Sequence, residues 1–155
     1  MTQDSKNLLR RWTSFTAAAL LLAISGLHVI WSQSTWPFES NAEFMQSLIG
    51  TSDVSRMPSA AEALVVAVGL MAAAWIVLAS VDVVGWPFSR RLLYWCGYAV
   101  TAIFLVRGIA GLLLPLTNLT VSEPFARLNL AVYSPVTILL GASIFVSLSL
   151  RSKRT

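Results

Sequence analysis

Arg107 is the residue whose type and position most clearly suggest chemistry, because it is the only charged side chain in residues 92–116. Placing a guanidinium at bilayer depth costs about 2.5–3.5 kcal/mol on insertion scales, so such a residue usually faces protein or water. Because small residues let a neighbouring helix approach closely, we expect Arg107 to point into a helix bundle. On a helix, the small residues of this run share one face, with Arg107 at its edge: Gly97, Thr101, Gly108, Gly111 and Pro115.

Four other residues near the outer ends of apolar runs are candidates for a shared site with Arg107: His28, Trp31, Glu62 and Tyr133. Arginine binds carboxylate and phosphate groups through charge-assisted, often paired hydrogen bonds, so Arg107 is the candidate contact for an anionic group. The pattern predicts an outward-facing polar pocket that binds a small molecule or a lipid headgroup. The expected partners of Arg107 inside that pocket are Glu62, Tyr133 and His28.

Two of these residues also have simpler interpretations. His28 is either an interfacial histidine whose ring bonds a backbone carbonyl, or a ligand contact or proton carrier in the pocket. Glu62 follows Ser59 in a Ser-x-x-Glu capping box, so its carboxylate either binds the Ser59 amide or points into the bundle. Both interpretations of each residue fit the sequence.

Several kinds of chemistry have no signature here. The chain contains one histidine and one cysteine, so neither a metal site nor an internal disulfide is expected, and we predict no cofactor. The sequence holds no His-Glu-x-x-His, phosphate-binding loop or nucleophile elbow, and no catalytic residue is assigned. The net charge of +4 reflects basic residues at the ends of apolar runs, so we expect no nucleic-acid partner.

Four apolar runs define the fold class. The chain has 155 residues, of which 56% are hydrophobic and 12% charged. A helix that spans a bilayer needs about 20 apolar residues, and the runs that qualify are residues 12–31, 60–84, 92–116 and 130–150. We therefore predict a single all-α domain, a polytopic four-helix bundle in a membrane. The first run lacks a cleavage site of small residues and is expected to remain as a span.

The basic residues predict how the chain crosses the membrane. They cluster before the first run, between the second and third runs, and after the fourth, and positive clusters stay on the cytoplasmic side. Both termini are therefore expected to be cytoplasmic, with the two longer loops outside. The clusters are Lys6, Arg10 and Arg11; Arg90 and Arg91; and Arg151, Lys153 and Arg154.

The two outer loops carry helix signals of their own. In the first loop, Ser40 and Glu43 form a second capping box, and Gly50 ends an apolar pattern, which predicts a short interfacial helix or lid over residues 41–49. In the second loop, Ser122 followed by Glu123 and a proline marks a helix start. Pro135 lies further along this helix and predicts a kink.

Short motifs occur along the chain: Gly26-Leu27-His28 with Trp31, Trp36-Pro37-Phe38, Arg107-Gly108 and Tyr133-Ser134-Pro135. They resemble those of the domain-of-unknown-function family 3995, which comprises small four-span bacterial membrane proteins. The resemblance covers most of the chain from the first to the fourth span. It implies a four-helix membrane fold and a bacterial cytoplasmic membrane, and it implies no activity.

Three kinds of function fit these observations. The first is a binding or accessory membrane protein whose pocket holds a small molecule or lipid headgroup. The second is a transporter that acts as an oligomer, and the third is an intramembrane enzyme that uses His28 and Arg107. The expected partners are the lipid bilayer, a lipid or small-molecule ligand, and a second copy or another membrane protein. A buried His–Glu pair would favour catalysis, and a path through an oligomer interface would favour transport.

Overall fold

The computed structural model describes residues 2–117 and 119–150, and this part of the chain is entirely helical in its regular structure. Four helices are long and apolar enough to cross a membrane: Gln3–Trp31, Ala60–Ser80, Arg90–Leu116 and Glu123–Ser149. The predicted all-α four-span fold is therefore confirmed. The basic cluster at Arg151, Lys153 and Arg154 lies outside the described residues.

The described residues contain ten helical elements, of which seven build the four spans. Helix α1 is Gln3–Trp31, α3 is Ala60–Ser80, and α4 is Arg90–Leu113, continued by the 3-10 turn η3, Leu114–Leu116. The last span joins α5, Glu123–Leu128, to the π-helical turn η4, Asn129–Tyr133, and to α6, Ser134–Ser149. The first outer loop contains α2, Asn41–Phe44, the π-helical turn η1, Met45–Ile49, and the 3-10 turn η2, Val54–Arg56.

Three span boundaries lie four or more residues from the predicted ones. The fourth span begins at Glu123, at the helix start predicted from Ser122, rather than at residue 130, and local backbone chemistry explains the other two. Helix α1 starts at Gln3 rather than at residue 12, because the Thr2 hydroxyl accepts a hydrogen bond from the Ser5 amide and caps the helix. Helix α3 ends at Ser80 rather than at residue 84, because the chain leaves the helix there and Asp82 adopts a positive φ of 61°.

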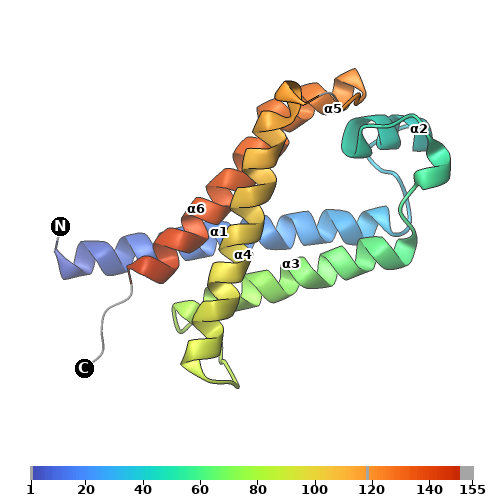
Figure 1. The fold of residues 1–155 in the computed structure, drawn as a ribbon. Helices are drawn as coiled ribbons and strands as arrows, with labels where there is room; N and C mark the ends of the chain where they lie inside the picture. The colour runs from blue at the N-terminus through green and yellow to red at the C-terminus, as the bar shows by residue number, and fades with distance from the viewer. Residues whose placement is uncertain (1, 118, 151–155) are drawn as a thin grey trace.

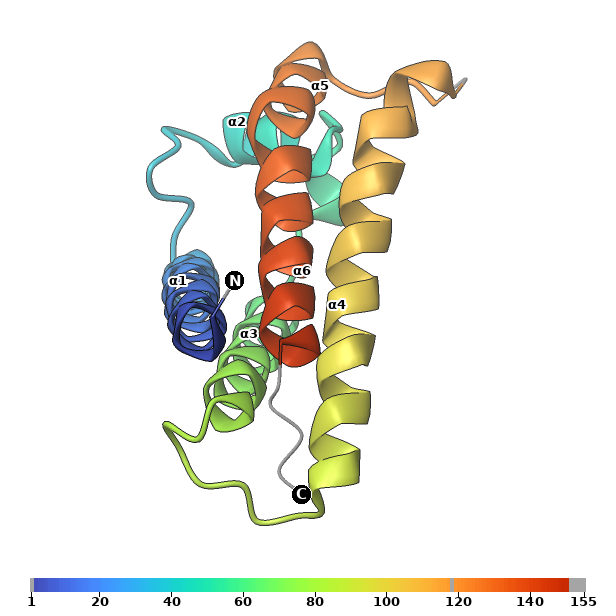
Figure 2. The ribbon, with the colours of Figure 1, turned by 90° about the vertical axis from the view of Figure 1, so that its left-hand side faces the viewer.

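The spans form two antiparallel pairs that cross each other (Figures 1 and 2). Helices α1 and α3 lie side by side in one pair, and α4 and α6 lie side by side in the other. The pairs cross near the ends of α3 and α6 that lie close to the start of α1. Their opposite ends diverge, and α2 lies in the opening between them (Figure 1).

Small residues let α4 and α6 approach closely. A Cβ atom added at Gly108 would lie 2.5 Å from Ile138 Cγ1, and one added at Gly97 would lie 2.8 Å from Leu148 Cδ1. Gly141 of α6 meets α4 in the same way, since its Cβ would lie 2.8 Å from Leu105 Cγ. The predicted packing face of α4 is thus correct for Gly97, Thr101, Gly108 and Gly111, which are buried, while Pro115 is exposed.

The core lies where the two pairs cross. It contains alanines of α1 and α3 together with leucines and an isoleucine of α6: Ala17, Ala18, Leu21, Ala73, Ala74, Val77, Leu140, Ile144 and Leu148. Small side chains on α1 and α3 allow the second pair to cross at close range. The outer half of α3 lies beyond this crossing, so Glu62, Val66 and Gly69 are exposed.

Arg10 connects three helices at the crossed end of the bundle. Its Nε donates to the Ser147 carbonyl oxygen of α6 at 3.0 Å, and its Nη2 donates to the Ser80 carbonyl oxygen of α3. These carbonyls lie in the last turns of their helices, where the same helix offers no amide to donate a hydrogen bond to them. Beside Arg10, the hydroxyls of Ser14, Ser80 and Ser147 form a buried hydrogen-bonded group.

We expect Arg10→Ala to lower the free energy of unfolding by about 1.5–3 kcal/mol, the usual contribution of hydrogen bonds that involve a charged group. Arg11→Ala is the matched control, because Arg11 is exposed and its substitution removes the same charge one residue along the helix. Thermal unfolding in one detergent compares the two variants. Equal melting temperatures for both variants would contradict a structural role for Arg10.

Candidate binding pocket

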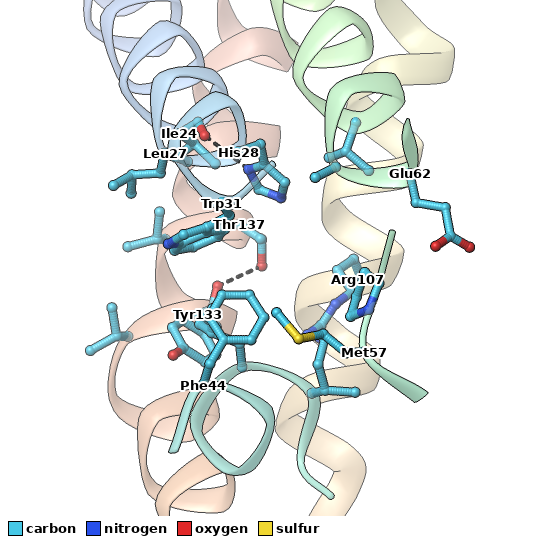
Figure 3. Close-up of a pocket in the computed structure, with 17 residues that line it drawn as sticks. Ile24, Leu27, His28, Trp31, Phe44, Met57, Glu62, Arg107, Tyr133 and Thr137 are labelled. Atoms are coloured by element: carbon cyan, nitrogen blue, oxygen red, sulfur yellow. Dashed lines mark hydrogen bonds between the residues drawn. The ribbon is translucent and has the colours of Figure 1, made fainter. Parts of the chain in front are cut away.

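A cavity of about 690 Å³ lies between the diverging ends of the two helix pairs. Its wall comes from the last turns of α1, the start of α3, the middle of α4, and the junction of η4 with α6, while α2 and η1 cover it. All five residues predicted for a shared site line this cavity: His28, Trp31, Glu62, Arg107 and Tyr133 (Figure 3). Their role in binding stays a prediction, but the fold brings them to one place.

The cover of the cavity is the short helix predicted in the first outer loop. Residues 41–49 are helical, as expected, with α-helical geometry in α2 and π-helical geometry in η1. Ser40 Oγ accepts from the Glu43 amide, and Gly50 ends the helix with a positive φ of 86°. The predicted capping box is incomplete, because the Glu43 carboxylate accepts from the Glu39 amide at 2.9 Å instead of the Ser40 amide.

Side chains from α1, α5 and η4 hold this cover in place. The Tyr133 hydroxyl donates to the Ser47 carbonyl oxygen at 3.2 Å, and the Ser122 hydroxyl donates to the Gln46 carbonyl oxygen. Both acceptors lie in the last turn of η1, whose carbonyls lack helical partners. On the other side, the Phe44 ring packs edge-on against the Trp31 ring, with centroids 5.6 Å apart. Tyr133 is therefore an anchor of the cover as well as a lining residue.

Arg107 reaches the cavity from α4 and contacts a residue that the sequence analysis did not single out. Its Nη1 donates to Asn129 Oδ1 at 3.4 Å. None of the three expected partners, Glu62, Tyr133 and His28, forms a hydrogen bond or ion pair with Arg107 in the described residues, so that expectation is wrong. The hydrogen-bond partner of the guanidinium is a neutral amide, which does not compensate the positive charge of Arg107.

Asn129 owes its position to the π-helical turn that precedes Pro135. The side chain is 1% exposed, and its Nδ2 donates to the Gly111 carbonyl oxygen at 2.7 Å. Its Oδ1 also accepts from the Ser134 hydroxyl at 3.2 Å. Pro135 was expected to cause a kink, and the helix irregularity before it is the π-helical turn η4. Turns of this type often occur at functional sites. The sequence signal that could have pointed to Asn129 is an asparagine six residues before an interior proline.

Glu62 forms the helix-capping contacts that were the simpler of its two interpretations. Its carboxylate accepts from the Ser59 amide at 2.7 Å and from the Ser59 hydroxyl at 2.8 Å, while Ser59 caps the Glu62 amide. The capping box at the start of α3 is thus complete. The side chain is exposed and points away from the centre of the cavity (Figure 3). Glu62 therefore borders the cavity but does not neutralise Arg107.

His28 also forms the backbone contact of its simpler interpretation. Its Nδ1 lies 2.9 Å from the Ile24 carbonyl oxygen and donates a hydrogen bond to this acceptor. The ring lines the cavity beside this contact. The His28 ring also packs against the Trp31 ring, with centroids 5.0 Å apart. In the part of the chain that the structure describes, no carboxylate contacts His28.

The ion pairs of the described residues lie elsewhere, at exposed positions: Arg56 with Asp53, Arg90 with Asp82, and Arg127 with Glu123. No cluster of histidine, cysteine or acidic residues that could hold a metal ion occurs within residues 2–117 and 119–150. The cavity is thus apolar over most of its wall, with Arg107 as a cation that has no acidic partner among these residues.

The comparison with protein families identifies the group to which this sequence belongs. The sequence model of the family described as "Protein of unknown function (DUF3995)" matches residues 19–144. The chain belongs to this family. The matched range contains every residue that lines the cavity of this DUF3995 chain, whereas Arg10 and Ser147 lie outside it. No curated protein and no solved structure matches the chain.

Proposed function

We propose that this DUF3995 protein binds a small amphiphile with an anionic group, and that Arg107 is the contact for that group. One observation carries the proposal: a guanidinium without an acidic partner in the described residues lines a mostly apolar cavity of about 690 Å³. Pockets for small ligands have volumes of about 300–1,000 Å³ and combine apolar walls with a few polar groups. The cavity fits this description.

The energetics of Arg107 support an anionic rather than a neutral ligand. Arg107 is exposed, but at bilayer depth a charge without a partner is unfavourable because lipid tails do not solvate it. A carboxylate or phosphate restores the missing charge interaction and accepts two hydrogen bonds from the planar guanidinium. Asn129 accepts one hydrogen bond from Nη1, which fixes the orientation of the group while leaving the other nitrogens available for a ligand.

The two alternative functions have less support. An enzyme that uses His28 would need a partner for its proton, yet Nδ1 bonds a backbone carbonyl and the nearest candidate acid, Glu62, caps α3. A transporter that acts as an oligomer would need a path at the interface between copies, whereas the cavity lies within one chain. Binding requires neither feature.

The proposal includes a location in the bacterial cytoplasmic membrane, with both termini in the cytoplasm and the cavity in the outer half of the bilayer. The basic residues Lys6, Arg10 and Arg11 lie in the first three turns of α1, and Arg90 and Arg91 begin α4 after the loop between the second and third spans. Such clusters remain on the cytoplasmic side of bacterial membranes. The Arg10 contacts with the ends of α3 and α6 place these segments at one end of the bundle.

Labelling of introduced cysteines tests this topology. A membrane-impermeant maleimide added to intact cells should react with Asp53→Cys in the first outer loop and should not react with Arg90→Cys. The native Cys96 is replaced by Ser in both variants, so that each protein carries one thiol. Labelling of Arg90→Cys without cell lysis would overturn the orientation.

Binding itself is tested with decyl phosphate as the anionic probe and decanol as its uncharged counterpart. We expect decyl phosphate to raise the melting temperature of the purified protein in a concentration-dependent way, because a ligand that binds the folded state stabilises it. Decanol should give a much smaller shift. Equal shifts for both compounds, or none for decyl phosphate, would overturn the proposed anion site.

A further inference from the structure

The exposed part of the cavity wall indicates where a ligand enters. Six lining residues are exposed, and five of them come from η1, the loop before α3, the first turns of α3, and α4: Ile49, Pro58, Glu62, Val66 and Arg107. The sixth, Val132, belongs to η4. Lining residues of α1 and α6 are half-buried, and Phe44 in the cover is buried. The opening of the cavity therefore lies mainly between α3 and α4, and we call it the α3–α4 opening.

This opening continues below the outer ends of the helices. Val66 lies six residues into α3, which corresponds to about 9 Å along the helix axis. Arg107 lies nine residues before Leu116, about 13 Å along α4 and η3. The apolar core of a bilayer is about 30 Å thick, so both residues lie at the depth of the outer lipid leaflet. Figure 1 shows α3 and α4 diverging toward these ends.

The surface on both sides of the α3–α4 opening is apolar. Val65 and Val68 of α3 are 72% and 58% exposed, and Ile103 and Val106 of α4 are both 67% exposed. Side chains of this kind face lipid in a membrane-spanning helix. On the water side, the cover is held by the Tyr133 and Ser122 hydroxyls and by the Trp31–Phe44 contact.

From these observations, and resting on the proposed anion site, we infer that the ligand is an anionic phospholipid of the outer leaflet that enters sideways through the α3–α4 opening. Its phosphate would bind Arg107, and an acyl chain would occupy the apolar part of the cavity. A lipid can reach Arg107 from the bilayer without moving the cover. A water-soluble anion gains nothing from the apolar wall or from an opening at this depth.

The ligand class is tested by titrating the purified protein in a neutral detergent and counting bound molecules by native mass spectrometry. The probes are dioctanoyl phosphatidylglycerol, dioctanoyl phosphatidylcholine, and glycerol 3-phosphate, which carries a phosphate but no acyl chain. We expect one phosphatidylglycerol per chain, bound at least about tenfold more tightly than the other two, which corresponds to 1.4 kcal/mol. Similar binding of phosphatidylcholine, or equal binding of glycerol 3-phosphate, would overturn the lipid inference.

The route is tested by narrowing the α3–α4 opening. Val66→Trp places a large side chain on the cavity wall, whereas Val65→Trp places the same side chain one residue away, outside the cavity. In nanodiscs that contain a fluorescent phosphatidylglycerol, we expect Val66→Trp to slow association at least about tenfold, equivalent to about 1.4 kcal/mol of barrier, and Val65→Trp to leave it unchanged. Association that is unaffected in both variants would overturn the sideways route.

The decyl phosphate experiment separates this inference from the proposed function. If decyl phosphate binds through Arg107 but dioctanoyl phosphatidylglycerol does not, the anion site stands and the phospholipid assignment fails. If neither amphiphile binds, the proposed function fails together with the inference that rests on it.

Discussion

Arg107→Leu is expected to weaken binding of decyl phosphate strongly while leaving the protein folded. Loss of hydrogen bonds that involve a charged group weakens binding by about 1.5–3 kcal/mol, or roughly 10- to 150-fold. The fold should tolerate the change, because leucine removes an insertion cost of about 2.5–3.5 kcal/mol. Asn129 keeps its bonds to the Gly111 carbonyl and the Ser134 hydroxyl. Titration calorimetry and thermal unfolding measure the two effects separately.

Two further variants show whether the effect belongs to the guanidinium. Arg107→Lys should bind with an affinity between those of the wild type and Arg107→Leu, because lysine keeps the charge but lacks the planar pair of donors. Arg127→Gln removes a charge from an exposed residue of α5 that does not line the cavity and should bind normally. Wild-type affinity in Arg107→Leu would exclude Arg107 as the anion contact.

Gly111→Ala is expected to lower both stability and binding, although it adds one methyl group. The new Cβ would lie 2.1 Å from Ser134 Oγ, 2.8 Å from Asn129 Oδ1 and 3.0 Å from Arg107 Nη1. The buried Asn129 would have to move, and Arg107 would lose the group that orients it. Overpacking of this kind costs about 1–3 kcal/mol, which thermal unfolding detects.

Two comparisons make this prediction specific. Gly69→Ala in α3 has no atom within 4 Å of the added Cβ, so it should stabilise its helix, since alanine is favoured over glycine by about 1 kcal/mol. Adding Ser134→Ala to Gly111→Ala removes the closest clashing atom and should recover part of the lost stability. A stable Gly111→Ala variant with normal binding would show that the positions of Arg107 and Asn129 do not depend on this glycine.

The local features of this protein followed from the sequence because their causes are local. Apolar runs of membrane-spanning length predicted the four spans, and the series of glycines on one face predicted the packing surface of α4. Ser59 and Glu62 lie three residues apart, a spacing that allowed their capping box to be predicted. Each of these features depends on residues within one helix, so its pattern can be recognised without the tertiary structure.

The tertiary structure decided which polar groups meet. Arg107 and Asn129 are 22 residues apart, and their contact requires α4 and α6 to pack through glycines and η4 to adopt π-helical geometry. Arg10 and Ser147 are 137 residues apart and meet only because the two helix pairs cross at that end. The same crossing makes the other ends diverge and opens the cavity. The sequence thus determined four spans and one cation, Arg107, within a span, while the crossing of the helix pairs, a long-range packing result, determined the cavity and the partner of that cation.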